Sequence, residues 1–147
     1  MKIGTGYFAK AKEYHDMGYS LVNVARKRPW FISQELFLNE LWTKLCPTEE
    51  ILKLKDDPFA YTAMYKDIVL NNVKRQTVFE ELLSVAQKEK TDKVVLLCYE
   101  SPEKFCHRHL IADWLNEGTG MNVQEIKIPT PNGSTQTTFS FFKETSK

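Results

Sequence analysis

Residues 93–99 read KVVLLCY and give the clearest strand signal in the chain. A continuous apolar run of this kind is typical of a strand that is covered on both faces. The following residues predict a loop over 100–103, a helix over 105–116 that ends before Gly118, and another strand over 122–128. This order is a compact β-α-β unit, whose two strands should be parallel. The stretch therefore predicts an α/β fold.

The residues before this unit supply two more strands and several helices. We expect strands at 3–7 and 20–25, with a short helix at 10–17 between them. Helical spacing of apolar residues then predicts a long helical insertion between the second and third strands, with helices over 33–45, 50–55, 58–70 and 77–88. We predict a single domain over residues 1–128. Residues 129–147 are expected to form a tail or an edge strand.

The composition excludes several classes of protein. Of the 147 residues, 42% are hydrophobic, which is too apolar for a disordered chain. The 20 Lys and Arg residues nearly balance the 19 Asp and Glu residues, which argues against a strongly basic nucleic-acid binder. We see neither a membrane-spanning run nor a secretory signal, and the 3 cysteines are an odd number. These features predict a cytoplasmic protein with free thiols and no membrane partner.

The chemistry-bearing residues lie between Cys98 and His109, where the buried strand ends and the next helix starts. Ligands bind at this edge of open α/β sheets, and a helix N-terminus attracts anions. Arg108 offers a planar donor fork for a carboxylate or phosphate. The thiol of Cys106 should have a lowered pKa at the helix start, and His107 can transfer protons near neutral pH. Glu100 is a candidate base, nucleophile or hydroxyl acceptor.

Each of these residues also has a structural alternative. Cys98 suits a small buried hydrophobe, and Arg108 could pair within the chain with Glu100 rather than with a ligand. A zinc site of both cysteines with His107 and His109 is disfavoured, because the spacing is not a standard one and the two histidines point about 200° apart on a helix. A redox pair of Cys98 and Cys106 lacks the C-x-x-C spacing. We therefore predict no metal site and leave the cofactor open.

The segments LLCYE over 96–100 and FCHRHLIADWL over 105–115 resemble domain-of-unknown-function family 488, as does GYSLVNVARKRPW over 18–30. The similarity runs from about residue 2 to residue 128. It implies a bacterial or phage protein with a Rossmann-like, three-layer α/β fold and a small, mostly parallel sheet, but no assigned reaction. Arg26 matches the family's arginine after the early strand. Asn23 and Ala25 replace an Asp-Val-Arg run found in many members.

Together these features predict a protein that binds, and in one reading processes, a small anionic ligand such as a nucleotide or nucleoside derivative. Glu100, Cys106 and His107 are the candidate catalytic residues. The candidate ligand-binding residues are Arg26, Cys98, Glu100 and Arg108. Three alternatives remain. The first is a non-catalytic protein that binds or sequesters the same ligand, and the second is a nucleic-acid-associated protein that uses the Arg26–Arg28 turn with Trp30. The third is a small interaction protein in which the motif only stabilises a loop. Whether the protein is an enzyme, and its oligomeric state, are left open.

Overall fold

A computed structural model describes residues 1–27, 29, 41–117 and 119–129. Its strands are β1 (Lys2–Tyr7), β2 (Ser20–Asn23), β3 (Lys93–Cys98) and β4 (Gln124–Glu125). Its α-helices are α1 (Ala11–Asp16), α2 (Trp42–Leu45), α3 (Glu49–Leu52), α4 (Pro58–Ile68), α5 (Arg75–Glu89) and α6 (His107–Asn116). Two short 3-10 helices cover Phe8–Lys10 and Leu70–Asn72.

The four strands form one parallel sheet in the order β2-β3-β1-β4. The apolar run at 94–98 is buried in full and pairs with β1 on one side and β2 on the other. The predicted parallel relation between β3 and the last strand is confirmed, but the two are not neighbours, because β1 lies between them. The carboxyl ends of β2 and β3 therefore meet at the same edge of the sheet.

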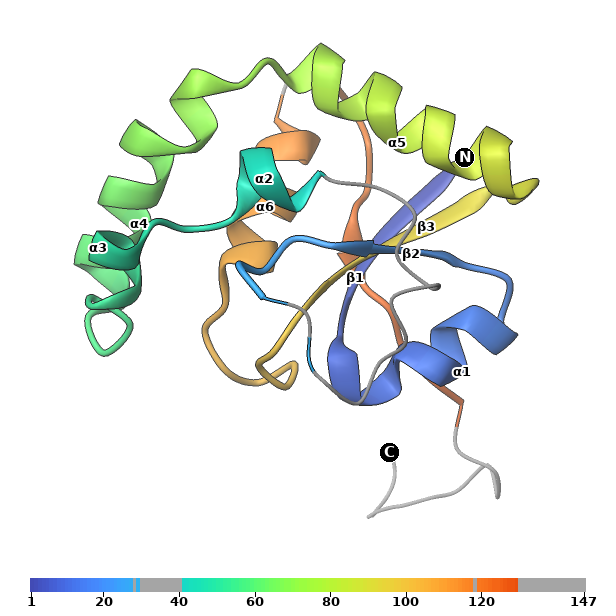
Figure 1. Ribbon diagram of the computed structural model, residues 1–147, viewed down its shortest axis with the longest axis horizontal. Coiled ribbons are helices and arrows are strands. Elements are labelled where there is room, and N and C mark those ends of the chain that lie inside the picture. Colours follow the sequence, from blue (N-terminus) through green and yellow to red (C-terminus); the bar gives the residue numbers. More distant parts are fainter. Residues whose placement is uncertain (28, 30–40, 118, 130–147) are drawn as a thin grey trace.

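Helices cover both faces of the sheet, as the predicted three-layer α/β arrangement requires. Figure 1 shows α5 and α1 on opposite sides of the strands. Both α5 and α6 contact β3, and Arg75 of α5 donates from Nε to the carbonyl oxygen of Trp114 in α6 at 2.6 Å. The helical insertion between β2 and β3 is also present, and its α4 contacts α6 at the end of the sheet where β3 finishes.

Two glycines let β1 lie close to its neighbours. A Cβ on Gly6 would come within 2.5 Å of the Tyr14 ring in α1, and a Cβ on Gly4 within 2.5 Å of Ile126. Both contacts lie far below an ordinary van der Waals separation. The glycines that weaken the strand signal of β1 are thus the residues that allow the layers to approach.

Helix starts in the insertion follow the capping residues. At the start of α3, the side chain of Thr48 accepts a hydrogen bond from the N–H of Ile51. At the start of α4, the side chain of Asp57, which directly precedes Pro58, accepts one from the N–H of Ala60. The last strand is much shorter than predicted, at two residues rather than seven. Helix α6 starts at His107, two residues later than expected. Most of the helix predicted over 33–45 and the tail from 130 lie outside the described residues.

No helix among the described residues has the length and apolar character needed to cross a membrane.

Candidate functional site

A pocket of about 460 Å³ lies at the carboxyl ends of β2 and β3. The residues just beyond these strands form one side, and the helical insertion forms the other through Pro47, Leu52, Lys55 and Tyr61. The first residues of α6 and the loop before it line the pocket as well. The strand-end edge that the sequence indicated is therefore the place where the structure has a hollow.

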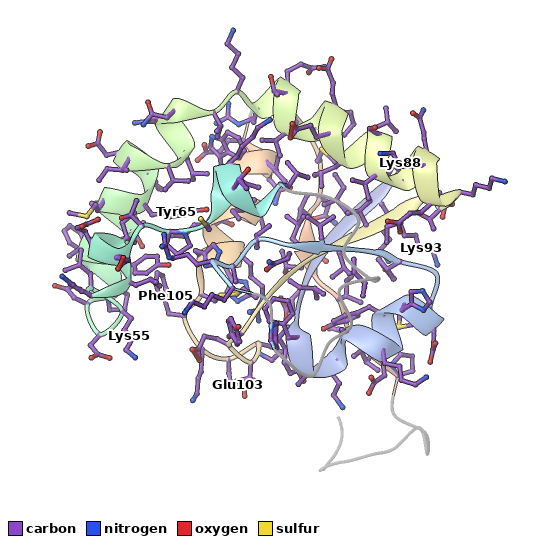
Figure 2. The ribbon with its side chains drawn as sticks, viewed as in Figure 1. Lys55, Tyr65, Lys88, Lys93, Glu103 and Phe105 are labelled. Atoms are coloured by element: carbon purple, nitrogen blue, oxygen red, sulfur yellow. A yellow bond between two sulfur atoms is a disulfide. The ribbon has the colours of Figure 1, made fainter. Side chains whose placement is uncertain are left out.

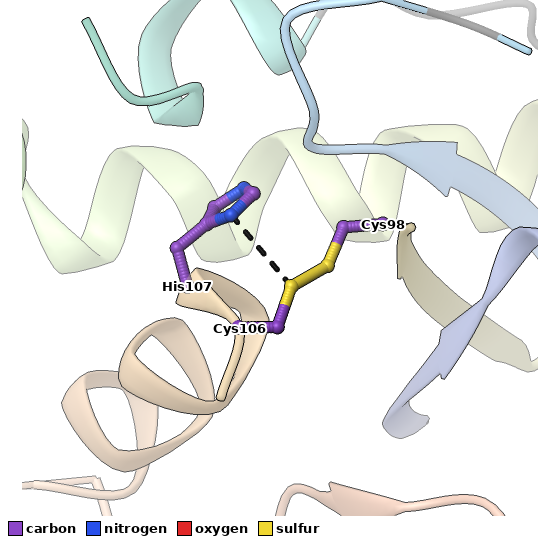
Figure 3. A group of neighbouring side chains, drawn as sticks. All are labelled: Cys98, Cys106 and His107. Atoms are coloured by element: carbon purple, nitrogen blue, oxygen red, sulfur yellow. Dashed lines mark hydrogen bonds between the residues drawn. A yellow bond between two sulfur atoms is a disulfide. The ribbon is translucent and has the colours of Figure 1, made fainter. Parts of the chain in front are cut away.

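Cys98 and Cys106 meet in this pocket. Cys98 ends β3, and Cys106 immediately precedes α6 with an extended backbone conformation. The loop between them folds back so that their sulfurs are joined in a disulfide, with Cα atoms 7.4 Å apart (Figure 3). This corrects the expectation of free thiols for these two cysteines. Only Cys46 is a free cysteine among the described residues.

His107 lies beside the two sulfurs and its ring orientation is fixed. Its Nε2 is 2.6 Å from the carbonyl oxygen of Val24, just beyond β2, and a carbonyl can only accept. Nε2 therefore carries the proton in the neutral ring, and Nδ1 keeps its lone pair. Nδ1 lies 3.8 Å from Sγ of Cys106. Burial lowers the pKa of His107 to about 4, with the nearby Arg108 charge adding to the effect, so the ring is neutral at physiological pH.

Arg108 is fully buried, and all three nitrogens of its guanidinium donate to atoms of this chain. Nε and Nη2 contact the two carboxylate oxygens of Glu125, each at 3.1 Å. Nη1 donates to Sγ of Cys98 at 3.2 Å and to the main-chain oxygen of Glu100 at 2.6 Å. The internal ion pair left open for Arg108 is thus present, but its partner is Glu125 and not the carboxylate of Glu100. Arg108 holds Cys98, the loop and β4 together.

Charged side chains surround the mouth of the pocket. Arg26, Lys27 and Lys55 supply three positive charges, and Glu100 supplies a carboxylate. All four residues are exposed. None of the three cations forms an ion pair within the described residues, although Nη1 of Arg26 reaches the carbonyl oxygen of Pro47 at 3.4 Å. The mouth therefore has a net positive charge that is not neutralised from within this part of the chain.

Aromatic rings form the remaining wall. Tyr61 of α4 and Phe105 meet edge to face with centroids 4.9 Å apart. Tyr65, one turn further along α4, is not among the lining residues. Its ring centroid is 5.6 Å from that of His107, and its hydroxyl donates to the carbonyl oxygen of Leu45 at 2.5 Å. Figure 2 shows Tyr65 and Phe105 on the same side of the molecule. Burial raises the pKa of Tyr65 well above its usual value, so the hydroxyl stays protonated.

Tyr99 connects the two strand ends. Its hydroxyl donates to the main-chain oxygen of Lys27 at 2.9 Å, and its ring meets Phe8 edge to face. Tyr99 is 51% exposed and lines the pocket. The turn after β2 and the loop after β3 are thereby held at a fixed separation.

His109 lies outside the sulfur cluster. Its Nδ1 is 4.0 Å from Glu125, and its Nε2 is buried with no hydrogen-bond partner among the residues that the structure describes. Burial lowers the pKa of His109. The separation of the two histidines follows the roughly 200° turn between them on a helix.

Sequence reasoning missed several contributors to the site, among them Lys55, Tyr61 and Glu125. Lys55 and Tyr61 come from the insertion, and the sequence contains no signal that aims them at the strand ends. Glu125 had only a weak signal in the sequence, namely a carboxylate within the alternating pattern of the last predicted strand. Its closeness to Arg108 arises only in the fold. Its other partner is Thr5, whose hydroxyl donates to Glu125 at 2.6 Å.

The parallel sheet, the covering helices and the strand-end pocket define an α/β protein whose candidate site combines two cysteines and a histidine. The chain belongs to the DUF488 family: the sequence model of the DUF488-N3a group, described as the active DUF488-N3 subclade, matches residues 8–119. No curated protein and no solved structure gives a significant match. The matched segment includes Cys98, Cys106, His107 and Arg108, and it stops before Glu125.

Proposed function

We propose that the pocket binds a small anionic ligand, of which a nucleotide or nucleoside derivative is the best candidate. The observation that carries this proposal is the net positive mouth, where Arg26, Lys27 and Lys55 outnumber Glu100 and form no ion pair within the described residues. A volume of about 460 Å³ falls within the range of small-molecule sites. Long cationic side chains at an open mouth suit a phosphate, because they can reach it while it stays partly hydrated.

The walls favour a ligand with a flat ring in addition to its anionic group. The half-exposed Tyr99 lines the pocket, and Phe105 and the buried Tyr61 line it as well. Aromatic side chains stack on nucleobases without requiring a specific hydrogen-bond pattern. Glu100 is the carboxylate placed to accept from a ligand hydroxyl. A sugar phosphate would use only the charged mouth, whereas a nucleotide would use both surfaces.

Arg108 acts in this proposal through other residues and not on the ligand. Its guanidinium is occupied by Glu125, Glu100 and Cys98, so it fixes the floor of the pocket. If the ligand is processed, the reacting groups line the pocket floor and rim: His107, Glu100 and, once the disulfide is reduced, Cys106. A protein that only binds or sequesters the ligand would use the same mouth and walls.

Titration calorimetry with AMP, adenosine, ribose 5-phosphate and inorganic phosphate tests the proposal. We expect AMP to bind more tightly than adenosine or phosphate alone, and Arg26→Ala and Lys55→Ala to weaken it. Lys88→Ala is the matched control, since this exposed lysine of α5 lies far from Lys55 (Figure 2). At a hundred times its Kd, the ligand should add about 2.7 kcal/mol to the free energy of unfolding.

Two results would contradict the proposal: no binding of any phosphate compound, or equal losses in Lys55→Ala and Lys88→Ala. Mass spectrometry of the recovered ligand then separates an enzyme from a binding protein. An unchanged ligand after prolonged incubation selects the non-catalytic alternative. If the unmodified protein alters the ligand through the Glu100 carboxylate, the Glu100→Gln variant should leave the ligand intact.

A further inference from the structure

We propose that Cys98, Cys106 and His107, when the cysteines are reduced, form a zinc site whose fourth position opens into the pocket. The proposal is independent of the anionic ligand, because it rests on the floor of the pocket and not on its mouth. The two sulfurs and a ring nitrogen lie within 4.8 Å of one another, and all three residues are buried. Thiolate and imidazole are the ligands that zinc prefers in proteins.

The distances suit a shared ion. Zinc–sulfur bonds of about 2.3 Å and zinc–nitrogen bonds of about 2.0–2.1 Å at a tetrahedral angle place sulfur and nitrogen about 3.6 Å apart. Sγ of Cys106 and Nδ1 of His107 are 3.8 Å apart. Two thiolate sulfurs bound to one zinc lie about 3.8 Å apart, which is further than the roughly 2.0 Å between the bonded sulfurs of a disulfide. The 7.4 Å between the two Cα atoms exceeds the usual span of about 4.4–6.8 Å for a disulfide, and it gives the reduced pair room for an ion.

The histidine is oriented as a metal ligand. Nε2 donates to the carbonyl oxygen of Val24, which leaves the Nδ1 lone pair directed at the sulfurs (Figure 3). A ligating histidine almost always donates its second ring N–H to a carbonyl or carboxylate, and this partner fixes the tautomer and the ring. The backbone at the end of β2 supplies that partner here without any side chain.

The surroundings of the sulfurs supply a cation and hydrogen-bond donors. Nη1 of Arg108 donates to Sγ of Cys98 at 3.2 Å, so the cation and a hydrogen bond act on that sulfur. Cys106 precedes the ten-residue helix α6, whose N-terminal N–H groups favour negative charge. The two thiolates would neutralise the divalent ion, and the carboxylate of Glu125 neutralises the guanidinium of Arg108, so the charges of the cluster would balance.

Three protein ligands leave one tetrahedral position free. Structural zinc sites usually have four protein ligands, and catalytic sites have three with water or substrate in the fourth position. Because all three residues line the pocket, the free position faces the space open to a ligand. Zinc there would hold a water molecule in its fourth position. The disulfide is the metal-free, oxidised state of the same two sulfurs.

Zinc binding by the full chain under a phosphine reductant tests the proposal. We expect about one zinc ion per chain after dialysis, measured by mass spectrometry of the metal. Cobalt should give the visible absorption of a tetrahedral ion with thiolate ligands. Cys98→Ser, Cys106→Ser and His107→Gln should each weaken zinc binding at least about 100-fold. Cys46→Ser and His109→Gln are the matched controls and should keep the full stoichiometry.

Alkylation of the unmodified chain avoids reliance on variants that fail to fold. With zinc present, Cys98 and Cys106 should react with iodoacetamide more slowly than without it, whereas Cys46 should react equally in both conditions. Peptide mapping assigns each site. A reduced, folded chain that takes up no zinc overturns the proposal, and so does zinc that protects all three cysteines or none. Neither result bears on AMP binding by the cationic mouth.

Discussion

Replacing Glu125 by glutamine removes the negative charge that faces the buried guanidinium of Arg108 while keeping nearly the same side-chain shape. Arg108 is 0% exposed and the Glu125 side chain is 21% exposed. Breaking a buried ion pair by removing one partner costs about 3–5 kcal/mol. The partial exposure of Glu125 gives water some access to the pair, so we expect a loss of about 2–4 kcal/mol in the free energy of unfolding. For a chain of this size, this is a fall of about 6–12 °C in Tm.

Urea denaturation followed by circular dichroism measures this loss. Glu117→Gln is the matched control, because Glu117 forms a 3.2 Å ion pair with Arg75 but is 62% exposed. An exposed pair contributes at most about 1 kcal/mol, so the control should stay close to the unmodified protein. In a double-mutant cycle, adding Arg108→Met to Glu125→Gln should cost less than the two single losses together, because the buried charge has gone.

The reasoning fails if Glu125→Gln and Glu117→Gln lose the same amount. It also fails if the effects of Arg108→Met and Glu125→Gln simply add. Either result would mean that the guanidinium is not held by Glu125 in solution. Arg108 would then again be a candidate for direct contact with a ligand anion.

Four other substitutions test individual contacts by the same unfolding assay. Gly6→Ala should cost about 1–3 kcal/mol, because its Cβ would meet the Tyr14 ring at 2.5 Å. Thr48→Ala should cost about 1 kcal/mol through loss of the α3 cap. Tyr65→Phe should cost about 1–3 kcal/mol, since it leaves the Leu45 carbonyl without its donor. Burial raises the pKa of Tyr14 from 10.0 to about 12, so the folded chain keeps a proton that the unfolded chain releases. The unmodified protein should therefore lose more stability than Tyr14→Phe as the pH rises from 10.0 to 12; equal losses would contradict this.

The fold was largely predictable because its strongest signals are local. The apolar, β-branched run in β3 is typical of a strand covered on both faces. Thr48 and Pro58 mark their helices through capping chemistry that acts within one turn. The length of strand β4 is overestimated because the sequence signal for it is also local. Its alternating pattern predicts seven strand residues, whereas only Gln124 and Glu125 pair with β1.

The candidate site was only partly predictable, because its key contacts join residues far apart in sequence. The strand-to-helix position of Cys98 and Cys106 was readable, but the return path of the loop between them depends on Arg108 holding the Glu100 carbonyl. Arg108 depends in turn on Glu125, seventeen residues later. Chain spacing alone could not reveal that the cysteines and His107 converge, or that Lys55 reaches the same pocket.

The strand order also decides when the nascent chain can fold. Strand β1 pairs with β3 from Lys2 opposite Lys93 onward, and β2 pairs with the other edge of β3. Among the described strands, neither β1 nor β2 has a partner in the sheet until β3 has left the ribosome, roughly 90 residues after β1. At about 5–20 residues per second this wait is roughly 5–20 s, during which two apolar strand edges are exposed. Holdase chaperones should therefore associate with ribosome-bound chains that stop before Lys93 and leave once β3 is synthesised.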